Sequence, residues 1–290
     1  MWKEQISVDG PYAFDRVLQR MSIDPLNHID EGKQMVKLPY TGAKKQAVTI
    51  TGIGTTQDPV FIVEGTYEED RKEIIRHVKD LFHWNHSLNE VDLHFSSSTL
   101  SNIFDVHKGT PLVREPSVYS CLLKSIIHQQ LNMAFAAVLT ERFVTTYGEN
   151  IEDVWFYPEP QTVAEITVEE LRALQFSQRK AEYVIGVGKK ILSGELELDR
   201  FPEMSDEEII EELVKLRGVG PWTAQNVLLF GLGRMDIFPF ADIGIQNALK
   251  KQFNMERKPT ILEMEEWTES WRPYLSYASL YLWRSIETGK

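Results

Sequence analysis

The sequence predicts an α+β fold, in which a small antiparallel sheet domain with helices precedes an all-α body. Three observations support this prediction. Alternating β-branched runs, broken by glycine and proline, occupy the first 66 residues. From Glu68 onward, the apolar residues recur with the period of a helix. The length of 290 residues is too great for a single small core and indicates two or three compact units.

The N-terminal segment, residues 1–66, is expected to form the small sheet domain. An amphipathic piece, YAFDRVLQRM, is followed by three strand-like runs, QMVKLPY, AVTITGIG and PVFIVEG. Turn-forming pairs such as Thr41-Gly42 and Asp58-Pro59 separate these runs. We therefore predict an antiparallel sheet accompanied by one or two helices.

The remaining chain is expected to be helical. EEDRKEIIRHVKDLFHW, SVYSCLLKSIIHQQ and NMAFAAVLTERFVTTYG each place apolar residues on one helical face. Capping-box spacings mark the start of two further helices, at Thr167 with Glu170 and at Ser205 with Glu208. The stretch HKGTPLVREPS is expected to be a connection inside this body.

Composition excludes several classes of protein. No apolar run approaches the roughly 18 residues of a membrane span, and the start has no signal-peptide pattern. The single cysteine, Cys121, excludes an internal disulfide and a four-cysteine cluster, and its helical surroundings predict core packing. The net charge of −12 argues against a basic coat for nucleic acid. We expect a soluble cytoplasmic protein, nucleoid-associated if it acts on DNA.

A glycine hairpin, LRGVG, joins a helix ending near Leu216 to one beginning near Pro221. Gly218 and Gly220 permit a tight turn, and proline suits a first helical position. Unpaired N–H groups of such a turn can bind an anion without adding formal charge. The pattern is equally compatible with a helical corner that binds nothing.

The wider context resembles a known family. LRGVGPWTAQNVLLFG followed by DIFPFADIGIQ is similar to the helix-hairpin-helix DNA glycosylases, nearest to the 3-methyladenine DNA glycosylase II branch. SIIHQQLNMAFAAVLTERFV, FSQRKAEYVIGVGKKI and RPYLSYASLYLWR resemble further segments of that family, over about residues 110–290. We accordingly expect a helical domain of residues 67–116 plus 236–290, and a hairpin-bearing domain of residues 117–235.

The resemblance implies a reaction. Members that also cleave the strand carry a lysine two residues after the hairpin, where this chain has Trp222. The implied enzyme removes the base by hydrolysis, without lyase activity, and leaves an abasic site. Asp242, 20 positions beyond Trp222, matches the catalytic aspartate. A carboxylate there stabilises the positive charge that develops on the sugar. Asp242 could instead be a helix N-cap, and the two roles are compatible.

The resemblance also implies how DNA is bound. A base inside a duplex must be extruded, and Gln130, with Leu131 beside it, occupies the position that fills the gap. The family branch often has an apolar residue there, so glutamine is a departure, and a polar helix end is the alternative. The hairpin residues Gly218, Val219, Gly220 and Thr223 are expected to contact DNA.

Aromatic residues are candidates for the base pocket. Trp222, Tyr281 and Trp283 would attract a cationic alkylated base through their electron-rich rings. Helical spacing makes core packing the alternative for Tyr281. Asn226 replaces an aromatic residue of the family branch and makes one pocket wall polar.

No cofactor is expected to be required. The family hairpin often holds a monovalent cation, and the matching main-chain carbonyls are those of Val214, Leu216 and Val219, which would bind Na⁺ or K⁺. The histidines of residues 83–94 are expected to face solvent rather than to bind zinc. The expected partner is double-stranded DNA with damaged bases, bound by a monomer.

Three functions are compatible with these patterns. The first is excision of alkylated bases such as 3-methyladenine and 7-methylguanine. The second is a glycosylase of the same superfamily that acts on deaminated or mismatched bases, which the polar Asn226 favours. The third is a non-catalytic DNA-binding protein that keeps the hairpin, which Asp242 in register disfavours.

Overall fold

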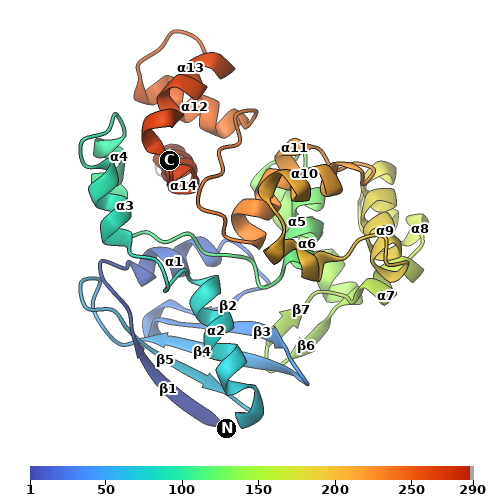
Figure 1. Ribbon diagram of the computed structural model, residues 1–290. Helices are drawn as coiled ribbons and strands as arrows, with labels where there is room; N and C mark the ends of the chain where they lie inside the picture. Colours follow the sequence, from blue (N-terminus) through green and yellow to red (C-terminus); the bar gives the residue numbers. More distant parts are fainter. Residues whose placement is uncertain (288–290) are drawn as a thin grey trace.

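The computed structural model describes residues 1–287, so the last three residues of the expected segment 236–290 lie outside the described residues. Figure 1 shows the sheet domain at one end of the molecule and two groups of helices above it. Helices α3, α4 and α12–α14 form one group, and helices α5–α11 form the other. The fold is therefore α+β, as the sequence predicts.

The N-terminal domain is built on one five-stranded antiparallel sheet. Its strand order is β1-β5-β4-β3-β2. The predicted runs form three of the strands, and β1 and β2 are additional. The strands are β1 Trp2–Ser7, β2 His28–Asp30, β3 Met35–Thr41, β4 Lys45–Gly52 and β5 Val60–Gly65.

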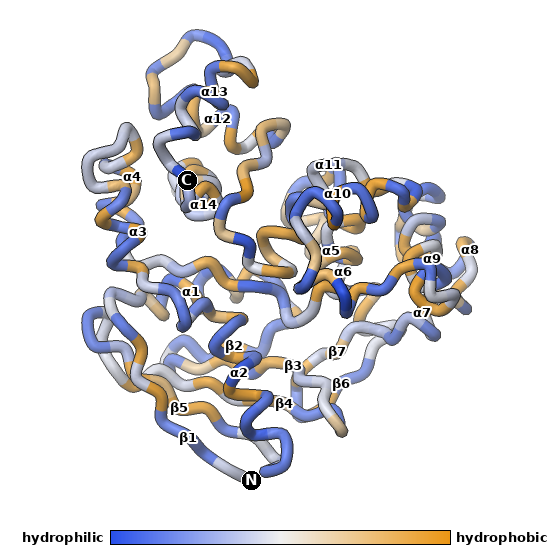
Figure 2. Tube along the Cα trace, viewed as in Figure 1, coloured by the Kyte–Doolittle hydropathy of each residue, from blue (hydrophilic) through white to orange (hydrophobic). Residues whose placement is uncertain are grey.

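One face of this sheet is closed by apolar residues from neighbouring strands. Ile50 of β4 pairs with Val36 of β3 and with Val63 of β5, and all three side chains are fully buried. Helix α1, Phe14–Met21, packs against this layer, and the ring of Phe14 meets that of Phe61 edge-on at 5.0 Å. Alternation with period two places every second residue on the buried face, and Figure 2 shows hydrophobic segments along the strands.

The helices of the body begin and end close to the predicted positions. The capping boxes predicted at Thr167 and Ser205 are both present. The α-helices after α1 are α2 Arg71–Leu81, α3 Leu88–Phe95, α4 Ser101–His107, α5 Val118–His128, α6 Met133–Tyr147, α7 Pro160–Glu165, α8 Val168–Ala173, α9 Gln178–Leu192, α10 Asp206–Val214, α11 Pro221–Asn226, α12 Ile243–Gln252, α13 Ile261–Thr268 and α14 Leu275–Glu287.

The body is not entirely helical, and this corrects the expectation of an all-α region. Strands β6, Glu149–Ile151, and β7, Val154–Phe156, form a hairpin whose residues Val154 and Phe156 pack against Ala47 of the main sheet. Both central turn residues, Glu152 and Asp153, have positive φ, as a tight hairpin turn requires. This turn lacks the usual glycine, and three-residue strands give little periodic signal.

Candidate active site

The hairpin between α10 and α11 depends on Gly218. Its φ is +88°, and an added Cβ would lie 2.1 Å from the ring of Tyr183. A side chain at this position would therefore be strained by the backbone and would clash with Tyr183. Gly220 has an extended φ of −107°, with open space where a Cβ would point. Glycine is therefore required at position 218, where the hairpin lies close to α9, and not at position 220.

Two side chains fix the turn between α5 and α6 beside this hairpin. Gln129 Nε2 donates to the carbonyl of Gly218 at 2.9 Å and to Thr223 Oγ1 at 2.8 Å. Lys180 Nζ donates to the carbonyls of Ile126, Ile127 and Gln129, at 3.1, 2.8 and 2.6 Å. The turn is thereby attached both to the hairpin and to α9. Sequence reasoning assigned no such role to Gln129 or Lys180, because their partners lie 50 to 95 residues away.

Partial burial changes the pKa of Lys180, one of the two side chains that hold this turn, which we call the clamped turn. It lowers the pKa of Lys180 from its ordinary value to about 8. The ammonium group remains mostly protonated at neutral pH. Its positive charge therefore interacts favourably with the carbonyl dipoles at the C-terminus of α5.

Gln130 and Leu131 occupy the tip of the same turn. Gln130 is exposed, and its φ of +56° is in the left-handed region that few residues other than glycine adopt. Leu131 is half-buried and lines the cavity described below. The clamped turn thus presents the Gln130 side chain outward and Leu131 inward.

The Asp242 carboxylate receives three hydrogen bonds. Trp222 Nε1 donates to Oδ2 at 2.8 Å, and Trp283 Nε1 donates to Oδ1 at 2.8 Å. Asp242 is also the N-cap of α12, where Oδ1 accepts from the N–H of Ile245 at 2.9 Å. The N-cap role considered for this residue is therefore confirmed, and its catalytic role stays a prediction. These three donors hold the carboxylate in one orientation.

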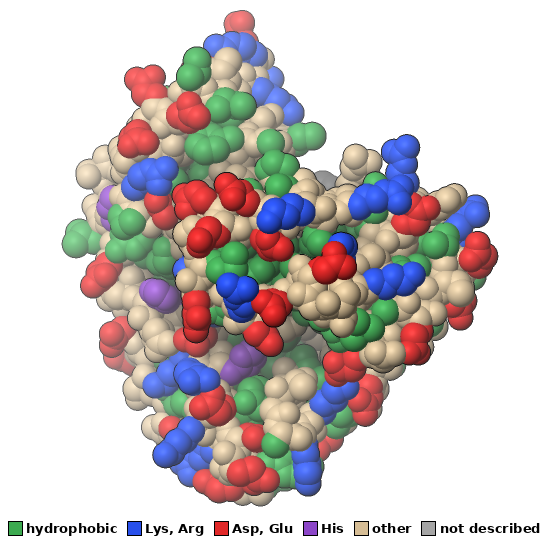
Figure 3. Space-filling model, turned by 45° about the vertical axis from the view of Figure 1, so that its right-hand side comes forward, with side chains coloured by type: hydrophobic (Ala, Val, Ile, Leu, Met, Phe, Trp, Pro, Cys, Tyr) green, Lys and Arg blue, Asp and Glu red, His purple; other side chains and the backbone are tan. Residues whose placement is uncertain are grey.

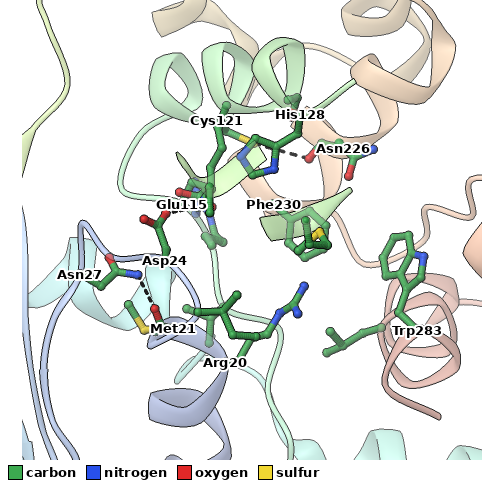
Figure 4. A pocket seen from close by; sticks show the side chains of 18 of the residues that line it. Arg20, Met21, Asp24, Asn27, Glu115, Cys121, His128, Asn226, Phe230 and Trp283 are labelled. Atoms are coloured by element: carbon green, nitrogen blue, oxygen red, sulfur yellow. Dashed lines mark hydrogen bonds and ion pairs between the residues drawn. The ribbon is translucent and has the colours of Figure 1, made fainter. Parts of the chain in front are cut away.

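The half-buried Asp242 lies on the wall of a cavity of about 390 Å³. Trp222, Asn226 and Trp283 line the same cavity. Phe230, which the sequence did not single out, also lines it, with its ring centroid 5.9 Å from that of Trp283. Figure 4 shows Phe230 and Trp283 facing the open space. This volume and its aromatic walls suit a planar ligand of the size of a nucleobase.

The structure corrects the prediction for Tyr281. Its side chain is fully buried, packs on Phe104 and donates from its hydroxyl to the carbonyl of Thr110 at 3.0 Å. It does not line the cavity, since α14 turns it toward α4 while Trp283 faces α12. Tyr281 therefore belongs to the core, which was the alternative interpretation of its helical spacing.

Two of the expected hairpin contacts point inward. The N–H of Val219 donates to the carbonyl of Leu216 at 3.0 Å, so it does not face outward as predicted. Thr223 is buried, and its hydroxyl oxygen accepts the bond from Gln129. The turn itself uses these groups, and contact of Gly218 and Gly220 with DNA stays a prediction.

The cavity has a polar end that the sequence did not reveal. Lys124 Nζ lies 2.8 Å from Asp24 Oδ2 and 2.7 Å from Glu115 Oε1. Burial opposes the charge on Lys124, but Glu115 and Asp24 raise its pKa well above the ordinary value. Asp24 follows α1, so the sheet domain contributes directly to the cavity wall. Figure 4 shows Asp24 and Glu115 across the open space from Trp283.

His128 and Cys121 complete this end. Burial lowers the pKa of His128 to about 4, so the imidazole is neutral at pH 7. Cys121 is buried, as predicted, and burial raises the pKa of its thiol. The thiol is therefore protonated and unreactive.

Side chains that could bind a metal ion do not gather into a site within residues 1–287. Among the described residues, no group of three or more histidine, cysteine, aspartate or glutamate side chains is arranged to hold a metal ion. The expectation that the histidines of residues 83–94 face solvent is wrong for His83, which is 3% exposed and whose pKa burial lowers to about 3.

Surface charge agrees with the composition. The face in Figure 3 intersperses lysine and arginine with many acidic side chains, and no continuous basic area covers it. Within residues 1–287, no helix combines the length and apolar character needed to cross a membrane.

The sequence and the fold are similar to those of known proteins. Over 289 residues the chain is 51% identical to the putative DNA-3-methyladenine glycosylase YfjP of Bacillus subtilis, covering 99% of this chain and 100% of that protein. It is 32% identical to the DNA-3-methyladenine glycosylase of the same organism, over 74% of this chain and 73% of that one. The fold is shared with 3-methyladenine DNA glycosylase from Archaeoglobus fulgidus, with a TM-score of 0.87, 20% identity and coverage of 100% and 99%.

The matched family segment contains most of the site. Residues 123–273 match the family described as HhH-GPD superfamily base excision DNA repair protein. This range includes the clamped turn, the glycine hairpin, Trp222 and Asp242. Its extent, together with the full-length similarity to YfjP, shows that the chain belongs to the HhH-GPD superfamily of base excision DNA repair proteins.

Proposed function

We propose that this protein is a monofunctional DNA glycosylase that extrudes alkylated bases, of the 3-methyladenine and 7-methylguanine type, and hydrolyses their N-glycosidic bonds. One observation carries the proposal: the Asp242 carboxylate is held by two indole N–H groups and a helix N-terminus on the wall of a cavity large enough to admit a nucleobase. The names of the relatives, DNA-3-methyladenine glycosylases, support the same substrate class.

Asp242 acts on the sugar rather than on the base. As the bond to the base lengthens, positive charge builds on the deoxyribose, and the fixed carboxylate stabilises it. The same group orients the water that completes the hydrolysis. An alkylated purine that carries formal positive charge is a good leaving group, so no acid needs to protonate it. Trp222, Trp283 and Phe230 supply electron-rich rings against this cation.

DNA binding is proposed for the hairpin and the clamped turn. The backbone at Gly218 and Gly220 approaches a phosphate, where N–H groups bind an anion despite the net charge of −12. Gln130, exposed at the tip of the turn, enters the gap left by the extruded base. Main-chain carbonyls of Val214, Leu216 and Val219 are proposed to hold Na⁺ or K⁺ between protein and phosphate.

We propose that lyase activity is absent, and the lysines near the cavity support this. Trp222 occupies the position of the nucleophilic lysine. Of the described residues that line the cavity, Lys124 is the one lysine, and its contacts with Asp24 and Glu115 keep it protonated. A protonated amine cannot form a Schiff base. Borohydride should therefore trap no protein–DNA adduct; a covalent adduct would refute the monofunctional assignment.

Release of free bases from methylated duplex DNA, identified by chromatography, tests the substrate class. We expect 3-methyladenine and 7-methylguanine in the supernatant and abasic sites in the DNA. Release of uracil or hypoxanthine alone, from matched duplexes, would instead support excision of deaminated bases, which the polar Asn226 wall favours. Binding without release of any base would support the non-catalytic alternative.

A further inference from the structure

The cavity has two chemically different ends. One carries Asp242 and the aromatic rings, where the glycosidic bond would lie. The other carries Asp24, Glu115, Lys124 and His128, which the proposed chemistry does not use. These four side chains come from the sheet domain, from the connection after α4 and from α5. An extruded base that bound between the two ends, with its sugar at Asp242, would direct its far edge toward this polar end.

The ion cluster at this end has one positive and two negative groups. Lys124 binds one oxygen of Asp24 and one of Glu115. The second oxygen of Asp24, Oδ1, accepts from the N–H of Leu26 at 3.0 Å. No described residue donates a hydrogen bond to Glu115 Oε2. The cluster therefore keeps a formal charge of −1 and an unused acceptor.

The arginines of the cavity wall are engaged elsewhere. Arg20 pairs with Glu287 at 2.9 Å, and Arg114 donates to the carbonyl of Gly231 at 2.7 Å. Arg284 donates to the carbonyl of Arg16 at 3.3 Å. Arg20 and Arg114 are thus held by partners outside the Asp24–Glu115–Lys124 cluster, in which Lys124 contacts both carboxylates.

His128 adds a second acceptor. The hydroxyl of Thr140 donates to the carbonyl of Ala136 at 3.0 Å, so it must accept the bond from His128 Nε2, also at 3.0 Å. The proton of the neutral imidazole is thus on Nε2, and Nδ1 is an acceptor. The polar end therefore offers acceptors at Glu115 Oε2 and His128 Nδ1.

We propose, on the basis of the glycosylase function above, that Asp24, Glu115, Lys124 and His128 form a specificity element that recognises the N–H edge of an extruded, amino-bearing cationic purine. Adenine and guanine derivatives present exocyclic amino groups that donate to such acceptors. Hypoxanthine and uracil have a ring N–H but no exocyclic amino group, so the acceptor that faces the amino group would be left unpaired. A buried polar site rejects a ligand that leaves its groups unpaired. The sheet domain thereby contributes to substrate choice.

The specificity element is tested by comparing the rates at which two bases are excised. Single-turnover excision of 7-methylguanine and of hypoxanthine is measured for wild type, Glu115→Gln and Asp24→Asn. We expect each variant to lower the ratio of the two single-turnover rate constants, 7-methylguanine over hypoxanthine, by about tenfold, which corresponds to the loss of one charge-assisted hydrogen bond. The second variant keeps an oxygen for the Leu26 N–H, so it serves if Glu115→Gln loses stability. Glu169→Gln, an exposed residue of α8 with the same charge change, is the control and should leave the ratio unchanged.

Two outcomes separate this inference from the function on which it depends. If wild type releases no alkylated purine, the proposed function fails and the inference fails with it. If wild type releases 7-methylguanine but the folded variants keep its ratio to hypoxanthine, the specificity element alone is refuted. A merely structural role would slow both substrates equally, and that result also refutes it.

Discussion

The indole N–H of Trp222 donates a hydrogen bond to Asp242 Oδ2 at 2.8 Å, across 20 residues of sequence. Trp283 makes the equivalent bond to Oδ1 from α14. The rings proposed to contact the base are thus the groups that orient the carboxylate proposed to act on the sugar. We therefore expect base recognition and bond cleavage to be coupled through these two hydrogen bonds.

Replacing Asp242 by asparagine should abolish most base release and spare the fold. Asparagine is as good an N-cap as aspartate, so α12 keeps its first hydrogen bond. The charge that stabilises the sugar cation is lost, and we expect excision to slow by about 10² to 10³-fold. Thermal unfolding and binding to abasic duplex should be close to wild type. A folded Asp242→Asn protein with normal excision would contradict the assignment.

The Trp283→Phe variant tests the coupling between ring and carboxylate. It keeps an aromatic face in the cavity and removes the N–H that orients Asp242. We expect kcat to fall about tenfold with a smaller change in KM, since loss of orientation affects the transition state more than binding. Trp155→Phe in β7, outside the cavity, is the matched control. An equal loss in both variants would argue against a positioning role.

The Gly218→Ala variant should weaken the hairpin. The new Cβ would meet the Tyr183 ring at 2.1 Å, at a φ that L-residues rarely adopt. We expect a loss of about 1–3 kcal/mol in the free energy of unfolding, together with weaker DNA binding. Gly220→Ala, with open space around its Cβ, should unfold near the wild-type temperature. Equal destabilisation by both substitutions would show that the contact with Tyr183 is unimportant.

The Lys180→Met variant should release the turn that carries Gln130. Three carbonyls at the end of α5 lose their shared donor. We expect about tenfold weaker binding to duplex with a flippable 2-aminopurine, and less of its fluorescence rise, because the turn must then be ordered on binding. Lys189→Met, an exposed change on the same helix, controls for the lost charge. Unaltered fluorescence in Lys180→Met would refute the clamp.

Acid should destabilise the protein between pH 6.5 and 4. Burial lowers the pKa of His83 to about 3, and those of His107 and His128 to about 4. As pH falls through 6.5 the unfolded chain binds protons that the folded chain does not, so stability is lost. Asp92 opposes this in part, because burial raises its pKa to about 6 and the folded state then binds the proton first.

Denaturant unfolding at pH 7 and pH 5 measures this effect. The His128→Gln variant keeps a donor for Thr140 and removes the titration. It should lessen the loss of stability between these pH values by about 2 kcal/mol, the value expected for one histidine shifted from 6.5 to about 4. If the variant loses as much stability between pH 7 and pH 5 as wild type does, His128 is not buried as a neutral group.

Local signals predicted much of this protein from sequence alone. Alternation and turn pairs located β3, β4 and β5, and capping boxes located the starts of α8 and α10. The register between Trp222 and Asp242 singled out a pair that the structure joins by a hydrogen bond. These features depend on residues close in sequence, or on a resemblance that fixes their spacing.

Tertiary structure alone decided the rest. It assigned Tyr281 to the core and Trp283 to the cavity. Two residues that are two positions apart on a helix lie on different faces of it. It also brought Asp24 of the sheet domain to Lys124 of α5, about 100 positions away. No periodicity or spacing encodes such a contact, since it exists only where two layers far apart in sequence pack together and bury an ion cluster between them.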